Sequence, residues 1–213
     1  MAIILDGTTG ISAPAIVDLD TPVDTTLGGT GITSPGSSTN VLTSDGTEWY
    51  SGAAGGGGGG ITAATAQSVA GVGYVDFTGI PSTAKRISIM LWSCQAGGAD
   101  LNINVGTAGG IVTTGYNAAS VICTNSGSVV NNYSLTKFLV LQDQVYSAND
   151  WNGFFVLNKV TGNKWSFAGS ANTYSAYTVT SAGRVDAGAN ITTIRVALNS
   201  GNFISGTVNI FYE

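Results

Sequence analysis

Six consecutive glycines interrupt the sequence at positions 55–60, directly after Gly52-Ala53-Ala54. Glycine loses more conformational freedom on folding than any other residue, so neither a helix nor a strand interior is expected across such a run. The run therefore separates an N-terminal arm, 1–54, from a C-terminal head, 61–213. We interpret the run as a hinge formed by Gly55, Gly56, Gly57, Gly58, Gly59 and Gly60. The alternative is a point where several chains pack so closely that no side chain fits, as at the collagen axis.

The arm lacks the apolar residues that a core of its own would need. Turn signals such as Gly28-Gly29-Thr30-Gly31 and Ser34-Pro35-Gly36 separate short apolar pieces. We therefore expect the arm to be extended, and to be ordered by a partner or by other copies of the chain. It carries six acids and no Lys or Arg, a net charge of −6, whereas residues 55–213 carry seven bases and six acids, a net charge of +1; the sum is −5. A basic surface for nucleic acid is not expected.

The head alternates apolar and polar residues with the period of β-strands, and no segment shows a helical period of useful length. Ile87, Ile89 and Leu91, for example, share one face of a predicted strand, and Gly162-Asn163 is typical of a hairpin turn. We expect strands over 72–78, 85–93, 101–105, 120–123, 136–141, 151–160, 164–168, 174–180, 191–198 and 203–212. This spacing favours an all-β fold, in which the extended arm precedes a jelly-roll-like antiparallel β-sandwich.

The composition excludes several classes of protein. Charged residues make up 9% of the chain, compared with about 25% in a typical globular protein. The sequence contains no histidine, which excludes His-based catalytic triads and His metal ligands. No apolar run is long enough to predict a membrane helix, and residues 1–6 do not resemble a signal peptide. Cys94 and Cys123 are interpreted as two buried thiols, with a disulfide bridge as the alternative.

The acidic residues form no pattern that is typical of catalysis or of metal binding. Glycoside hydrolysis needs two carboxyl groups at a defined separation, and Asp143 and Asp150, which flank a predicted loop, are the only pair that deserves comparison. Asp18, Asp20 and Asp24 lack the glycine turn and the distal glutamate of a calcium loop. We therefore expect no enzymatic activity, no cofactor and no bound metal.

Short blocks in both the arm and the head carry a family resemblance. In the arm they are 4–11 (ILDGTTGI), 27–36 (LGGTGITSPG) and 40–49 (NVLTSDGTEW). In the head they are 75–81 (VDFTGIP), 84–90 (AKRISIM), 110–116 (GIVTTGY) and 205–213 (SGTVNIFYE). Taken in this order, they resemble bacteriophage tail-fibre and other virion proteins. The resemblance implies a homotrimeric appendage with a β-sandwich head on a thin stalk, located in the phage virion after assembly in the host cytoplasm.

On this interpretation, the arm attaches to other phage structural proteins of the tail, baseplate or capsid. Main-chain pairing suits a segment with few large side chains. The small apolar residues expected to anchor the arm are Ile3, Leu5, Ile11, Leu27 and Ile32. Because the arm is short, a second hypothesis stays open: the protein is a head fibre, or a capsid or tail decoration protein, with a purely structural role.

Aromatic residues of the head are the candidates for ligand binding, because they offer a large rigid apolar face with a polar group beside it. Trp92, Trp151 and Trp165 lie in predicted strands and are expected in the core or at a trimer interface. The loops Thr124–Ser134 and Ala171–Tyr177 combine tyrosine with small polar residues, as adaptable binding surfaces do. The candidate glycan-binding residues are Tyr133, Tyr146, Tyr174 and Tyr177. We expect a host surface polysaccharide as the ligand; exposed tyrosines without a ligand are the alternative.

Overall fold

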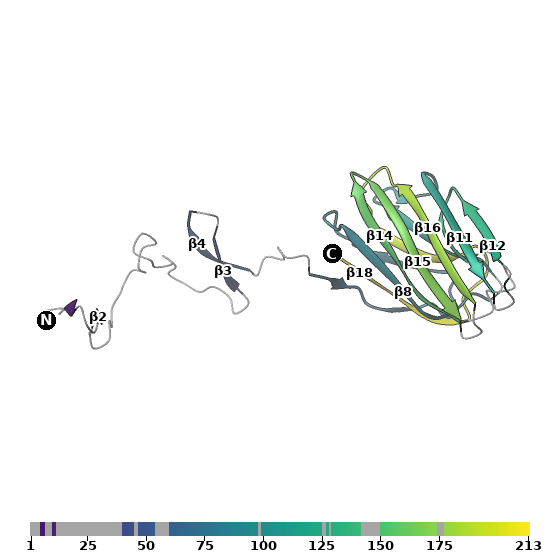
Figure 1. Cartoon of the computed structure of the whole chain (residues 1–213), viewed down its shortest axis with the longest axis horizontal. Coiled ribbons are helices and arrows are strands. Elements are labelled where there is room, and N and C mark those ends of the chain that lie inside the picture. Colours follow the sequence, from purple (N-terminus) through teal and green to yellow (C-terminus); the bar gives the residue numbers. More distant parts are fainter. Residues whose placement is uncertain are drawn as a thin grey trace. The chain divides into compact units, whose positions relative to one another are not determined.

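A computed structural model describes residues 5–6, 10–11, 40–44, 47–53, 60–97, 99–124, 127, 129–141, 150–173 and 177–213. The chain divides into two compact units, Met1–Gly60 and Ile61–Glu213. The described residues form strands, turns and loops, and none of them lies in a helix (Figure 1). All pairings between the described strands are antiparallel.

The described part of the first unit consists of two small two-stranded sheets. β1 (Leu5–Asp6) pairs with β2 (Gly10–Ile11), and β3 (Asn40–Ser44) pairs with β4 (Trp49–Ala53). No described side chain of β3 or β4 is buried. Their large apolar side chains are all about half exposed: Val41, Leu42, Trp49 and Tyr50. A lone two-stranded ribbon of this kind is at best marginally stable in water.

The second unit contains the remaining strands, which form two sheets. The strands are β5 (Thr62–Ala63), β6 (Gln67–Ser68), β7 (Tyr74–Thr78), β8 (Arg86–Gln95), β9 (Leu101–Thr107), β10 (Gly110–Ile111), β11 (Tyr116–Cys123), β12 (Val129–Ser134), β13 (Phe138–Leu141), β14 (Trp151–Thr161), β15 (Lys164–Thr173), β16 (Thr178–Asp186), β17 (Thr193–Leu198) and β18 (Ser205–Tyr212).

The larger sheet contains nine strands in the order β12-β11-β16-β15-β14-β8-β18-β5, with β6 also pairing with β18. Figure 1 shows its long strands side by side. β14 and β15 form a hairpin in which Trp151 lies opposite Thr173 and Thr161 lies opposite Lys164. The predicted hairpin at Gly162-Asn163 is therefore confirmed.

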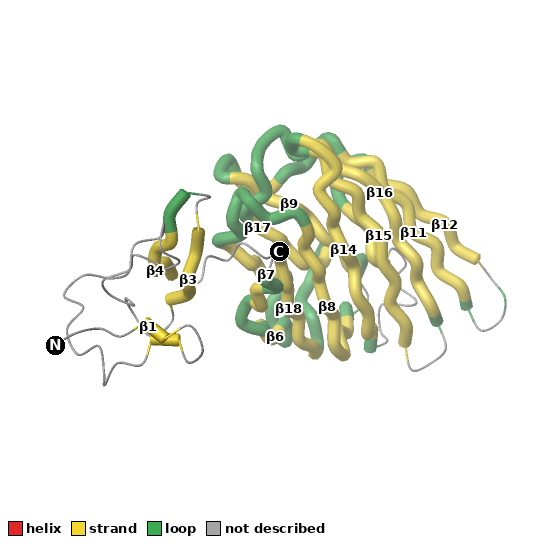
Figure 2. Tube along the Cα trace, turned by 60° about the vertical axis from the view of Figure 1, so that its left-hand side comes forward, coloured by secondary structure: helices red, strands yellow, loops and turns green. Residues whose placement is uncertain are grey.

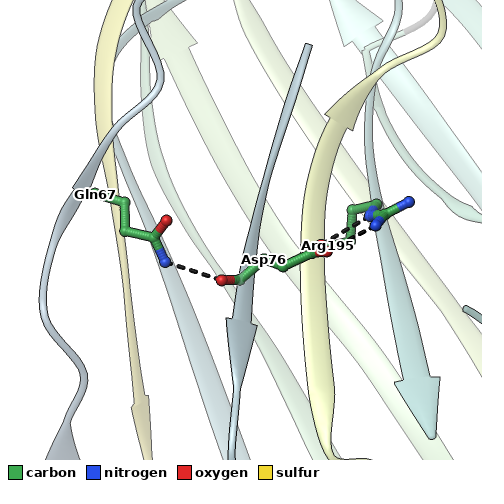
Figure 3. Close-up of polar contacts among 3 residues, drawn as sticks. All are labelled: Gln67, Asp76 and Arg195. Carbon is green, nitrogen blue, oxygen red and sulfur yellow. Dashed lines mark hydrogen bonds and ion pairs between the residues drawn. The ribbon is translucent and has the colours of Figure 1, made fainter. Parts of the chain in front are cut away.

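The smaller sheet has the order β10-β9-β17-β7, with β13 pairing with β9. Figure 2 shows β7, β17 and β9 beside the larger sheet. At its edge, Arg195 on β17 donates from Nε and Nη2 to the two carboxylate oxygens of Asp76 on β7, at 2.7 and 2.6 Å. This hydrogen bonding raises the pKa of Arg195 above its usual range. Gln67 Nε2, on β6 of the larger sheet, donates to the Asp76 carbonyl at 2.9 Å, so a side chain connects the two sheets at this edge (Figure 3).

The hydrophobic core lies between the two sheets. Phe138 on β13 stacks on Phe167 on β15, with ring centroids 4.1 Å apart, and Tyr116 on β11 meets Phe138 edge-on at 4.9 Å. Phe155 continues the stack at 5.5 Å from Phe167. Such ring contacts add to the free energy gained from burying the apolar area. The predicted all-β class with antiparallel sheets is confirmed, and the arrangement is consistent with a β-sandwich.

Several strand and loop predictions were wrong. The strand predicted over 164–168 continues to Thr173, so the loop predicted over Ala171–Tyr177 begins inside β15. The loop predicted over Thr124–Ser134 contains β12, an edge strand that pairs with β11; tertiary pairing overrides the weak strand propensity of its asparagines. The strand predicted to end at Thr180 continues to Asp186. Gly183 lies inside it because a Cβ there would come within 2.7 Å of the Ala118 backbone on β11, so a residue that looks like a strand breaker marks a close approach of two strands.

The prediction that Cys123 is buried was wrong, and Trp92 does not join the core, so its expected place at a trimer interface stays a prediction. Cys94 and Cys123 are both free thiols, and Cys94 is buried as expected, but Cys123 is exposed. On β11 the residues at even positions face the core, which turns Cys123 outward. Of the three tryptophans expected in the core or at an interface, Trp151 and Trp165 are buried, whereas 71% of the surface of Trp92 is exposed.

Candidate functional site

Trp92 is the most exposed of the large hydrophobic residues in the described part of the chain. It lies on β8, where Ile87, Ile89 and Leu91 face the core and Met90 and Trp92 face outward. The period of two therefore accounts for its direction. This signal was present in the sequence, since the same alternation had already assigned Ile87, Ile89 and Leu91 to one face.

A β-bulge holds the backbone directly after Trp92. The register of β8 shifts against both of its neighbours here, between Trp151 and Gly153 on β14 and between Ser205 and Thr207 on β18. Ser93 has a φ of 48°, and it is the only described residue other than glycine with a positive φ. Residues other than glycine rarely adopt this left-handed backbone conformation, and those that do are concentrated at functional sites. Bulges also redirect side chains next to such sites.

Neighbouring strands hold this strained backbone in place through specific contacts. Asn152 Oδ1 accepts a hydrogen bond from the Ser93 N–H at 2.9 Å, and Ser205 Oγ donates to the Ser93 carbonyl at 3.1 Å. Gly206, with a φ of 125°, passes so close that a Cβ there would lie 2.6 Å from the Cα of Cys94. Cys94 Sγ donates to the carbonyls of Thr207 and Trp92 at 3.5 and 3.7 Å, and burial raises the pKa of its thiol to about 11.

The bulge opens onto a hollow of about 470 Å³, which we call the Trp92 hollow. It is lined by Trp92, Ser93, Asp150, Asn152 and Asn172. Its volume is within the range of roughly 300–1,000 Å³ that is usual for small-molecule sites. An indole face offers apolar contact, and the amides and the carboxylate beside it donate and accept hydrogen bonds. Together these groups suit a ligand with an apolar face and hydroxyl groups at its rim, as a sugar has.

The two described tyrosines among those predicted to bind glycan, Tyr133 and Tyr177, are not in the lining of this hollow. Tyr133 lies on β12 opposite Ala119 and is 59% exposed. Tyr177 is partly buried against the core, and its carbonyl accepts a hydrogen bond from Thr173 N–H at 2.9 Å. Tyr146 and Tyr174 lie outside the described residues. Neither described tyrosine therefore shares a hollow with Trp92.

The predicted anchoring and hinge residues are only partly within the described chain. Leu5 on β1 lies opposite Ile11 on β2. Ile3, Leu27 and Ile32 lie outside the described residues. Of the glycine run, Gly60 is described and is exposed, and 55–59 are outside the description.

Most of the acidic residues compared with catalytic and calcium-binding patterns lie outside the described chain. Asp143, Asp18, Asp20 and Asp24 lie outside the described residues, whereas Asp150 lines the Trp92 hollow. Among the described side chains, no three of His, Cys, Asp and Glu come together as metal ligands would. Among the residues that the structure describes, no helix is long and apolar enough to cross a membrane.

Comparison with known proteins gives no family for this chain. No protein-family model matches it, and no curated protein matches it significantly. Its function must therefore be inferred from the residues themselves.

Proposed function

We propose that this protein is a structural component of a bacteriophage virion. In this proposal it is a short trimeric fibre whose head, 61–213, binds a host cell-surface glycan and whose arm, 1–54, anchors it to the particle. The sequence blocks in the arm and head support the phage assignment. The Trp92 hollow supports glycan binding, and it is the observation that carries this part of the proposal.

The folding of a single chain does not account for the Trp92 hollow. A large apolar side chain that stays exposed loses the roughly 1.5–3 kcal/mol that burial provides. A left-handed Ser93 costs about 1–3 kcal/mol more. Asn152 accepts a hydrogen bond from the Ser93 N–H and also lines the hollow. The strained backbone at Ser93 is therefore directly connected to the groups that line the hollow. Sugar binding gives that structure a use, since the indole face covers the sugar ring and the amides reach its hydroxyl groups.

The jelly-roll-like head and the trimer belong to this proposal as well. The chain crosses repeatedly between the two sheets, from β7 to β8, from β8 to β9 and from β17 to β18, as the chain of a jelly roll does. The ribbon of β3 and β4 buries no described side chain, so it needs other surfaces to be stable. Three copies of the arm provide such surfaces. Trimerisation also raises the avidity of a weak sugar site without any new contact.

One observation favours a purely structural decoration protein as the second candidate. On the outer face of the larger sheet, Met90 lies opposite Phe154, and they are 45% and 55% exposed. The same row continues with the small residues Ser170 and Thr180 on β15 and β16. A flat, uncharged row of this kind suits packing against another protein of the particle.

The experiment that tests the proposal is competition for adsorption. Purified full-length protein in excess is expected to lower adsorption of the phage that carries it at least tenfold. Trp92→Ala is expected to lose this competition, whereas Tyr133→Ala, which removes another exposed aromatic side chain, keeps it. A folded, trimeric wild-type protein that does not compete would favour the decoration protein instead.

A further inference from the structure

A second hollow, of about 330 Å³, opens on the outer face of the larger sheet. Its lining includes Ile61, Arg86, Ser88, Met90, Phe211 and Glu213. The lining residues on β8 and Phe211 on β18 alternate with buried residues, which places them on the side of the sheet away from the core. Ser88 lies opposite Phe211 in the register, so both strands contribute to one patch of this face. We call it the Met90 hollow.

The Met90 hollow lies next to the Trp92 hollow along β8. Met90 lines one and Trp92 lines the other, and they are consecutive outward residues of that strand, roughly 6.6 Å apart along it. The Trp92 hollow reaches Asn172 on β15, and the Met90 hollow reaches Ile61, which directly precedes β5. In the order β15-β14-β8-β18-β5, the two hollows therefore extend over four spacings between neighbouring strands, roughly 19 Å in all.

Apolar side chains line the Met90 hollow without being buried by the fold. Met90 is 45% exposed and Ile61 is 67% exposed, and Phe211 is partly exposed. Together with Trp92, they form an apolar series that runs from one hollow to the other. Exposed apolar surface that is concave and bordered by polar groups is typical of a ligand-binding groove. Such a series can contact the apolar faces of successive sugar rings.

Two side-chain amides beside this series are available to a ligand. Asn209 lies opposite Met90. Its Oδ1 accepts a hydrogen bond from the Ile210 N–H at 2.9 Å, whereas its Nδ2 has no hydrogen-bond partner among the described residues. The side-chain amide of Asn172, in the Trp92 hollow, has no partner within that part of the chain either. Amides both donate and accept hydrogen bonds, so they suit the hydroxyl groups of a sugar.

The charges in the two linings favour an uncharged ligand. Arg86 Nη1 lies 3.4 Å from Glu213 Oε1, so the two charges of the Met90 hollow form an ion pair. The lining of the Trp92 hollow adds one carboxylate, Asp150, and no cation. An anionic ligand would therefore meet the negative charge of Asp150 without an unpaired cation to compensate it.

We propose that the two hollows form one groove, which binds an uncharged polysaccharide chain along several of its sugar units. Trp92 contacts one ring, and the apolar side chains of the Met90 hollow contact the rings that follow it. The amides of Asn172 and Asn209 bind hydroxyl groups at the edges of these rings. That the ligand is a glycan rests on the proposed function, whereas its length and its lack of charge follow from the groove.

Calorimetric titration of the full-length protein with fragments of host surface polysaccharide tests this groove. Partial hydrolysis produces the fragments, which are separated by charge on an anion-exchange column and then by length. We expect the affinity for uncharged fragments to rise at least tenfold from one sugar unit to four or more, because only the longer fragments reach the Met90 hollow. Acidic fragments that bind more tightly than uncharged ones, or that alone bind, would overturn the preference for an uncharged chain.

Substitutions in the Met90 hollow distinguish a groove from bridging between copies of the protein. Ile61→Ala and Phe211→Ala are expected to reduce the gain with length to less than threefold. Tyr133→Ala, which removes an exposed aromatic side chain from β12 at the far edge of the same sheet, keeps the gain. Because Ile61 is largely exposed, its substitution leaves the core intact. A gain that survives both substitutions would come from bridging and would overturn the groove.

A protein partner is the alternative occupant of this face. If Phe211→Ala alters the oligomeric state in light scattering and leaves the gain with length unchanged, the Met90 hollow is a protein contact and the proposal is overturned. Equal affinity for fragments of all lengths would also overturn the groove, but the glycan site at Trp92 would stand. Binding of no fragment would contradict the groove and the proposed function together, so the two failures are distinguishable.

Discussion

The two ends of the larger sheet each present a tryptophan, but in opposite ways. At one end, Trp92 faces outward beside amides and the carboxylate of Asp150. At the other end, Trp165 faces inward, and the Nζ atom of Lys159 lies 5.6 Å from the centroid of its ring. The alternation along each strand decides which tryptophan joins the core, and the neighbouring strands decide which chemistry surrounds it. The comparison shows that two factors determine the surroundings of a side chain in a sheet. Its odd or even position along the strand determines the face on which it lies, and the pairing of strands determines its neighbours.

The largest expected effect is a difference in stability between the two tryptophans. Trp165→Ala is expected to lower the free energy of unfolding by about 3–5 kcal/mol, because it leaves a cavity in the core. Trp92→Ala is expected to change it by less than about 0.5 kcal/mol, because the side chain is exposed. Urea denaturation followed by circular dichroism measures both. Equal losses would break the comparison and would make Trp92 a structural residue.

The bulge below Trp92 is expected to show the next largest effect. Gly206→Ala places a Cβ 2.6 Å from the Cα of Cys94 at a φ of 125°, so we expect a loss of about 3 kcal/mol together with a displaced Trp92. The control is Gly188→Ala, where φ is 70° and nothing lies within 4 Å of the new Cβ. It is expected to cost only about 1 kcal/mol. Similar losses in both variants would mean that backbone conformation, and not close contact, dominates at Gly206.

The smallest of these effects depends on pH. Burial raises the pKa of Cys94 from 9.0 to about 11. A thiol whose folded-state pKa is raised contributes stability that is fully present below pH 9 and is lost as the pH rises towards 11. The expected loss is about 2 kcal/mol at pH 11. Denaturation of the wild type and of Cys94→Ala at pH 8, 9.5 and 11 measures it, and the variant lacks this part of the loss. Parallel pH profiles for the two proteins would contradict the assigned cause.

The sequence predicted the fold class better than it predicted the sites. Alternation and the turn at Gly162-Asn163 were enough for the antiparallel strands and for the β14–β15 hairpin. The same alternation would have turned Trp92 outward, but the size and apolar character of its side chain favoured the core. The alternation along β11 likewise turns Cys123 outward, but the apolar character of its thiol favoured a prediction in the core.

Other features depend on pairing between distant strands, which no local pattern contains. Gly206 meets Cys94 only because β18 pairs with β8. Lys159 reaches the ring of Trp165 only because β14 pairs with β15, which sets these two residues opposite each other. The strain at Ser93 follows from register shifts against two neighbours. These features become visible only when the strand order and register are known.

The most direct test of the central claim is calorimetric titration of full-length protein with surface polysaccharide extracted from host cells. We expect the wild type to bind, Trp92→Ala to lose at least tenfold in affinity, and Tyr133→Ala to bind as the wild type does. If Trp92→Ala is folded and binds the polysaccharide as tightly as the wild type, the exposed indole is not part of a glycan site and the account is contradicted.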